Sequence, residues 1–165
     1  MSASATASKL KIMRIKKHIG AEVSGVDLRQ PLDCVTRQII HDALIENVVI
    51  VIRDQNFTST EYRQAAEQFG ELMEDQNRMY LADGEPLVSV LSNRLKASNG
   101  KPAKVGANAI WHTDHTNHEC PPKYTTLYAV ELPDKGGITN VVNMRAAYDA
   151  LSLEWKKRID PLQTA

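Results

Sequence analysis

The amino-acid sequence predicts a mainly β protein in which a largely antiparallel sheet is flanked by helices. Short runs of β-branched and apolar residues occur on both sides of a long polar loop at residues 93–109. Other segments repeat their apolar residues with the spacing of a helix that buries one face. Strands that outnumber helices and lie on both sides of this loop favour a mainly antiparallel sheet with flanking helices.

The first half of the chain is predicted to contain three strands. Residues 10–17 alternate apolar and basic side chains, which is typical of an exposed edge strand. Residues 21–28 form a second short strand, punctuated by glycines. Residues 48–52 are continuously apolar and β-branched, so they predict a strand that is buried on both faces.

Two helices are predicted between and after these strands. The apolar spacing at residues 33–47 is helical, and a second helix is expected from the Thr58–Ser59 pair to Phe69, ending at Gly70. Glu61 is well placed to complete a capping box in the first turn of the second helix. The expected N-caps are Asp33 or Thr36 for the first helix and Thr58 or Ser59 for the second.

The second half continues with strands and ends with two helices. A tight turn at residues 133–137 is expected to separate two of the strands. The predicted strands are 87–91, 124–132 and 138–142, and the predicted helices are 145–151 and 153–159.

Composition excludes several classes of protein. The 165 residues suit one ordinary domain, and 42% of them are hydrophobic, which is sufficient for a core. Twenty basic and twenty acidic residues give a net charge of zero, which argues against nucleic acid as a partner. No apolar stretch is long enough to span a membrane. Two cysteines are too few for a disulfide framework, so we expect reduced thiols and a cytoplasmic location. The oligomeric state is left open, a homo-oligomer included.

The densest group of metal-binding side chains lies at residues 111–120, which read Trp-His-Thr-Asp-His-Thr-Asn-His-Glu-Cys. In an extended chain, residues i and i+2 project to the same side. His112 and Asp114 can therefore bind one metal ion together. An imidazole and a carboxylate are two of the three protein ligands in the facial triad of non-haem ferrous oxygenases. The third ligand would come from elsewhere in the fold.

A zinc site is an alternative reading of the same segment. Nitrogen and sulfur ligands suit zinc, and the candidates are His112, His115, His118 and Cys120. His115 and His118 would share one side of a helical turn, but Pro121 and Pro122 disfavour a helix there. Structural zinc sites also usually draw their ligand pairs from two separated segments, and the sequence has no second cluster.

Several short motifs follow one another in order between Ile19 and Leu151. They are segments 19–28, 53–55, 69–72, 111–114, 121–122, 132–133, 136–139 and 144–151. In this order and spacing they resemble the TauD/TfdA family of ferrous-iron and 2-oxoglutarate-dependent dioxygenases. Ile138 departs from the family pattern, which has Asp at this position of a Gly-Gly-Asp-Thr motif.

The resemblance implies a double-stranded β-helix, or jelly roll, and an iron-dependent oxidation. His112 and Asp114 would be iron ligands, Thr139 would bind 2-oxoglutarate through its hydroxyl, and Asn108 would contact the substrate. The implied reaction uses Fe(2+), 2-oxoglutarate and dioxygen to hydroxylate a small organic acid, phenoxyalkanoate-like or sulfonate-like, with release of succinate and CO2.

The resemblance covers only the N-terminal portion of the family. We expect a disordered N-terminus at residues 1–9 and a dioxygenase-like domain at residues 10–165 that is truncated on its C-terminal side, which makes the jelly roll incomplete. The family's second iron-binding histidine and its 2-oxoglutarate-binding arginine have no counterpart after His118 and Arg158. Impaired activity is therefore expected. A non-catalytic, partner-binding remnant and a zinc-binding module at residues 112–120 are the alternatives.

Overall fold

The structure is a computed structural model that describes residues 9–74, 80–92, 94, 111–116 and 118–163. The expected disordered N-terminus, apart from Lys9, and most of the polar loop at 93–109 lie outside these residues. The chain divides into two compact units. The first comprises Met1–Asp27, Leu32–Gln55 and Thr139–Ala165, and the second Leu28–Pro31 and Asn56–Ile138. Within the described part, no helix is both long enough and apolar enough to cross a membrane.

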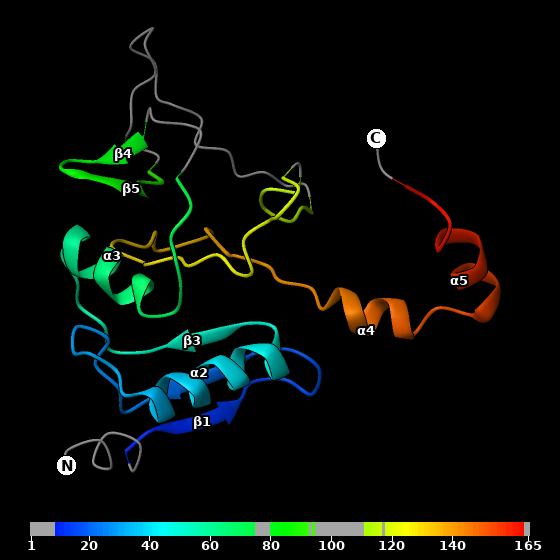
Figure 1. Ribbon diagram of the computed structural model, residues 1–165, viewed down its shortest axis with the longest axis horizontal. Helices are drawn as coiled ribbons and strands as arrows, with labels where there is room; N and C mark the ends of the chain where they lie inside the picture. Colours follow the sequence, from blue (N-terminus) through cyan, green and yellow to red (C-terminus); the bar gives the residue numbers. More distant parts are fainter. Residues whose placement is uncertain (1–8, 75–79, 93, 95–110, 117, 164–165) are drawn as a thin grey trace, which may run out of the picture. The chain divides into compact units, whose positions relative to one another are not determined.

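The first unit contains a three-stranded sheet with one helix packed on it (Figure 1). The strands are β1 (Lys11–Arg14), β2 (Ala21–Ser24) and β3 (Ile50–Ile52), in the order β1-β2-β3. β1 and β2 are antiparallel, whereas β2 and β3 are parallel. β1 lies at the edge and all four of its residues are exposed, as the alternation of basic and apolar residues predicts.

Helix α2 (Cys34–Asn47) connects the two parallel strands and covers them. Of the two predicted N-caps, the structure has Asp33, whose carboxylate accepts a hydrogen bond from the backbone N–H of Thr36. The buried side chains of α2 recur on one face, and Ile40, only 2% exposed, is the largest of its apolar ones. Ala21 and Val23 on β2 are fully buried. These residues form the core of the first unit.

The junction between α2 and β3 sets the register of the parallel pair. Val48 adopts a φ of 69°, which is rare for a β-branched residue. On either side of it, the carbonyls of Asn47 and Val49 accept hydrogen bonds from the backbone N–H groups of Gly20 and Ala21. The predicted strand at 48–52 therefore begins only at Ile50. It is half-buried rather than buried on both faces, and α2 packs on it.

The first unit also contains two short helices at the C-terminal side, α4 (Met144–Asp149) and α5 (Leu153–Ile159). Both predicted helices are thus confirmed, within one residue at the start of α4 and two at its end. Asn143 caps α4 and donates its side-chain N–H to the carbonyl of His18. Arg145 donates to the carbonyl of Ile45 at the end of α2. These two bonds attach α4 to the connection between β1 and β2 and to α2 of the same unit.

The second unit is built around helix α3 (Ser59–Glu67) and a two-stranded sheet of β4 (Leu81–Ala82) and β5 (Glu85–Ser89). The predicted capping box is present, with Thr58 and Glu61 bonding each other's backbone N–H groups. The helix ends at Glu67, so Gly70 lies beyond the cap. Arg63 binds the nearly buried carboxylate of Glu85 at 2.7 Å, which joins α3 to β5.

Two predicted strands are not found. Residues 124–132 and 138–142 are not paired into either sheet, and a strand requires a hydrogen-bonded neighbour. The sequence prediction also missed β4 and the parallel pairing of β2 with β3. Among the described residues the strands form two small sheets, and the longest strand has five residues against fourteen in α2. The described strands therefore do not by themselves confirm a mainly β fold or a jelly roll.

Candidate metal centre

The candidate metal ligands lie at a tight turn in the second unit. Asp114 begins the turn, and His115 follows with a φ of 54°, in the left-handed region that non-glycine residues rarely adopt. The backbone N–H of His118 donates to the carbonyl of His115 at 3.1 Å, and the two imidazole rings meet edge to face with centroids 5.4 Å apart. The turn therefore uses His115 and His118 for its own packing.

His112 and Asp114 point to the same side of the chain, two residues apart. His112 Nε2 lies 3.4 Å from Asp114 Oδ1, and the side chains are 57% and 43% exposed. Two ligand atoms bound to one metal at about 2.1 Å, and at right angles to each other, are about 3 Å apart. The observed separation is within a few tenths of an ångström of that value. An imidazole nitrogen and a carboxylate oxygen, both accessible, therefore fit a ferrous ion with open positions.

The carboxylate of Asp114 has a second partner that the sequence does not reveal. The hydroxyl of Thr125 donates to Asp114 Oδ2 at 2.8 Å. Thr125 belongs to the segment of residues 124–128. Residues 124, 126 and 128 of this segment form hydrogen bonds with a part of the second unit other than the turn that carries Asp114. Tyr124 donates to the carbonyl of Phe69, Thr126 shares a hydrogen bond with the hydroxyl of Tyr62, and Tyr128 accepts from the backbone N–H of Phe57.

An aromatic cluster secures this segment against α3. The ring of Tyr128 lies 5.1 Å from that of Phe57 and 5.6 Å from that of Tyr62, between centroids. Burial raises the pKa of Tyr124 and of Tyr62, although the hydrogen bond between Tyr62 and Thr126 lowers the pKa of Tyr62 in part. Both phenols therefore stay protonated at neutral pH and can act as donors. The only sequence signal for this anchor is the Tyr-Thr-Thr-Leu-Tyr alternation itself.

The four candidate zinc ligands do not converge. In the part of the chain that the structure describes, no three His, Cys, Asp or Glu side chains lie close enough together to hold a metal ion. His112, His115, His118 and Cys120 are all within that part. The structure thus offers a two-residue ligand pair and no zinc cluster at 112–120. The third iron ligand is not supplied by the described residues near the pair.

The other two predicted site residues are placed differently. Thr139 is exposed and belongs to the first unit, whereas His112 and Asp114 belong to the second. Asn108 lies outside the described residues. Their predicted roles toward 2-oxoglutarate and substrate stay predictions.

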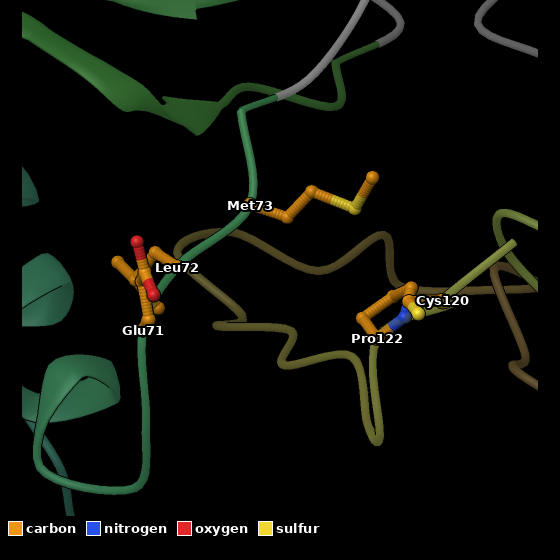
Figure 2. A pocket seen from close by; sticks show the side chains of 5 residues that line it. All are labelled: Glu71, Leu72, Met73, Cys120 and Pro122. Carbon is orange, nitrogen blue, oxygen red and sulfur yellow. The ribbon is translucent and has the colours of Figure 1, made fainter. Parts of the chain in front are cut away.

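An open pocket lies close in sequence to this segment, and all its lining residues belong to the second unit. It has a volume of about 340 Å³ and is lined by Glu71, Leu72, Met73, Cys120 and Pro122. Figure 2 shows the Met73 side chain extending from the segment after α3 toward the segment that carries Cys120 and Pro122. Cys120 and Cys34 are both exposed, and neither forms a disulfide among the described residues. The pocket is therefore formed where the two segments face each other.

Comparison with known sequences identifies the family. The sequence model described as "Taurine catabolism dioxygenase TauD, TfdA family" matches residues 11–165. The chain belongs to the TauD/TfdA family. The resemblance inferred from the ordered motifs is thereby confirmed. The description of the family names its members as dioxygenases.

Individual relatives match the chain over part of their own length. An alkylsulfatase of Acinetobacter baylyi is 35% identical over 87% of this chain and 42% of its own length. A 2,4-dichlorophenoxyacetate dioxygenase of Cupriavidus pinatubonensis, which depends on alpha-ketoglutarate, is 29% identical over 87% of this chain and 53% of its own. Among solved structures, a taurine dioxygenase from Burkholderia xenovorans is 32% identical over 47% of this chain and 28% of its own, with a TM-score of 0.45. The chain spans about half the length of the curated relatives it matches.

Proposed function

We propose that the protein to which this chain belongs is an Fe(2+)- and 2-oxoglutarate-dependent dioxygenase that hydroxylates a small organic acid. The observation that carries this proposal is the approach of His112 Nε2 to within 3.4 Å of Asp114 Oδ1, in a chain of the TauD/TfdA family. Iron bound to these two residues supplies the activation of dioxygen, coupled to oxidation of 2-oxoglutarate to succinate and CO2. The side chains provide the ligand atoms and keep part of the ion open.

The remaining roles in the proposed site follow the family pattern residue by residue. Thr139 donates its hydroxyl to 2-oxoglutarate, and Asn108 contacts the substrate. Residues 10–165 form part of one dioxygenase domain, and the whole protein adopts a double-stranded β-helix. The two free thiols support a reducing, cytoplasmic compartment.

The names of two relatives favour an organic anion as substrate, and one pocket has a size that suits a small molecule. The relatives named above act, by their names, on alkyl sulfates and on 2,4-dichlorophenoxyacetate, which are both organic anions. The pocket between Met73 and Cys120 has a volume at the lower end of the range for small-molecule sites. The lining includes a thioether, a thiol and a proline ring, which suit the apolar part of such a molecule, and the carboxylate of Glu71, which would not attract its anionic group.

The direct test is succinate formation by the protein supplied with Fe(2+), 2-oxoglutarate and oxygen. An alkyl sulfate and a phenoxyacetate are offered in parallel, and succinate is followed by NMR. We expect one of the two to stimulate succinate release, and His112→Ala and Asp114→Ala each to reduce it at least 100-fold.

The matched control is His118→Ala, which removes a histidine from the same turn without touching the ligand pair. This variant should retain most of the activity. Succinate release that is unchanged in His112→Ala, or absent with every anion offered, would overturn the proposal. Loss of activity in His118→Ala equal to that in His112→Ala would instead favour a histidine cluster.

A further inference from the structure

Asp114 lies on an exposed turn, so its carboxylate needs a partner to hold one orientation. The side chain is 43% exposed and is followed by the left-handed His115. A carboxylate in this setting turns about its Cβ–Cγ bond unless a hydrogen bond restrains it. The bond from Thr125 to Oδ2 provides that restraint at 2.8 Å.

The restraint also distinguishes the two carboxylate oxygens. Thr125 binds Oδ2, whereas Oδ1 is the oxygen on the side of His112 Nε2, 3.4 Å away. Hydrogen bonds to a ligand's second atom commonly fix the orientation of the ligand and raise metal affinity. The geometry thus directs Oδ1 toward the position where an ion would meet the imidazole.

Thr125 can act in this way because the residues on either side of it are anchored elsewhere. Tyr124 bonds the carbonyl of Phe69 and Thr126 bonds the hydroxyl of Tyr62 at 2.7 Å. In the contacts described for Tyr124 and Thr126, neither residue forms a hydrogen bond with Asp114. The segment therefore connects helix α3 and its flanks to one candidate ligand through a single side chain.

We propose that Thr125 is a positioning residue that orients the Asp114 carboxylate for metal binding, with its hydroxyl holding Oδ2 so that Oδ1 faces His112. This inference rests on the proposed function of His112 and Asp114 as metal ligands. It adds a residue to the site that does not itself touch the metal.

The test measures Mn(2+) affinity of the full chain by electron paramagnetic resonance, which detects free Mn(2+) without any catalytic turnover. Thr125→Val keeps the shape of the side chain and removes the donor. We expect its dissociation constant to rise about tenfold, as for other residues that orient a metal ligand. Thr125→Ser restores the hydroxyl and should return the affinity to within about twofold of the parent.

Thr126→Val is the matched control, because it removes a hydroxyl one residue away that bonds Tyr62 instead. Its Mn(2+) affinity should stay within about twofold of the parent. Equal losses in the Thr125 and Thr126 variants would show that packing of the segment matters rather than the bond to Asp114, and would overturn the inference.

The ligand variants separate this inference from the proposed function. If His112→Ala and Asp114→Ala weaken Mn(2+) binding while Thr125→Val does not, the metal site stands and the role of Thr125 is wrong. If none of these variants changes Mn(2+) binding, or if the parent chain binds no Mn(2+), the proposed metal site is wrong, and the positioning role of Thr125 is wrong as well.

Discussion

Two regions of the molecule are stabilised by different means. In the layer of α2, β2 and β3, apolar side chains are removed from water, with Ala21 and Val23 fully buried and Ile40 nearly so. In the described part of residues 111–138 no residue is buried, and large apolar side chains such as Val130 and Ile138 are at least 80% exposed. This second region is shaped by hydrogen bonds that a few hydroxyl groups donate or accept.

The difference separates stability from function in this chain. Apolar burial supplies most of the free energy of folding, so the layer in the first unit determines whether that unit is stable. The candidate ligands lie in the polar region, where each hydrogen bond is worth little by itself but fixes a direction. Substitutions in the first region should change stability, and those in the second should change local order or metal affinity.

The largest expected effect tests the buried layer. Ile40→Ala removes most of a side chain that is 2% exposed and leaves a cavity between α2 and β2. The free energy of unfolding should fall by about 3 kcal/mol, measured by urea unfolding followed by circular dichroism.

Ile45→Ala on the same helix is the control, since this side chain is 54% exposed. Its effect should stay within about 0.5 kcal/mol. Similar losses at the two positions would contradict the view that burial under α2 dominates this region.

A smaller effect is expected in the polar region. Tyr128→Phe retains the aromatic packing but removes the hydroxyl that accepts the hydrogen bond from the backbone N–H of Phe57. Loss of about 1 kcal/mol corresponds to an approximately fivefold faster hydrogen exchange of the Phe57 amide. Tyr148→Phe in α4, whose hydroxyl bonds Asp160, should leave that amide unchanged. Unchanged exchange in Tyr128→Phe would mean that the hydroxyl does not hold the segment.

The smallest effect concerns pH. Hydrogen bonding from Thr60, and the bond and charge of Arg63, lower the pKa of Glu85 below its ordinary value. Because the pKa is lower in the folded state, the stabilisation is present at neutral pH and is lost as the pH falls below about 4. Glu85→Gln should therefore show a weaker loss of stability in the second unit between pH 7 and pH 3.5, measured by hydrogen exchange of β5.

The exposed Glu71→Gln is the matched control, and its acid profile should follow that of the parent. An identical pH profile in the parent and in Glu85→Gln would mean that the ion pair does not stabilise the contact between α3 and β5.

The sequence predicted the features that are encoded locally. Asp33 caps a helix because its carboxylate reaches an N–H three residues ahead, and Thr58 with Glu61 forms a capping box for the same reason. The spacing of His112 and Asp114 likewise places their side chains together without any help from distant residues.

Features that depend on a partner far along the chain were not predictable in this way. Residues 124–132 have the composition of a strand, yet they belong to neither sheet, and within the described part of the chain the hydrogen bonds of residues 124–128 are made by side chains. The parallel pairing of β2 with β3 depends on the path of α2 between them. Thr125 forms a hydrogen bond with Asp114, which lies eleven residues earlier and on the other side of a turn, and a single threonine in the sequence does not indicate such a contact.

The alternation of partners along residues 124–128 restricts insertions and deletions in this segment. A residue inserted or deleted between Tyr124 and Thr126 would exchange the two sides for every position beyond it, so Asp114 and Tyr62 of α3 could not both keep their hydrogen bonds. Replacement of the 67% exposed Leu127 disturbs neither side. This stretch should therefore accept new side chains at position 127 while its number of residues stays fixed, and length differences between relatives should fall in the neighbouring loops.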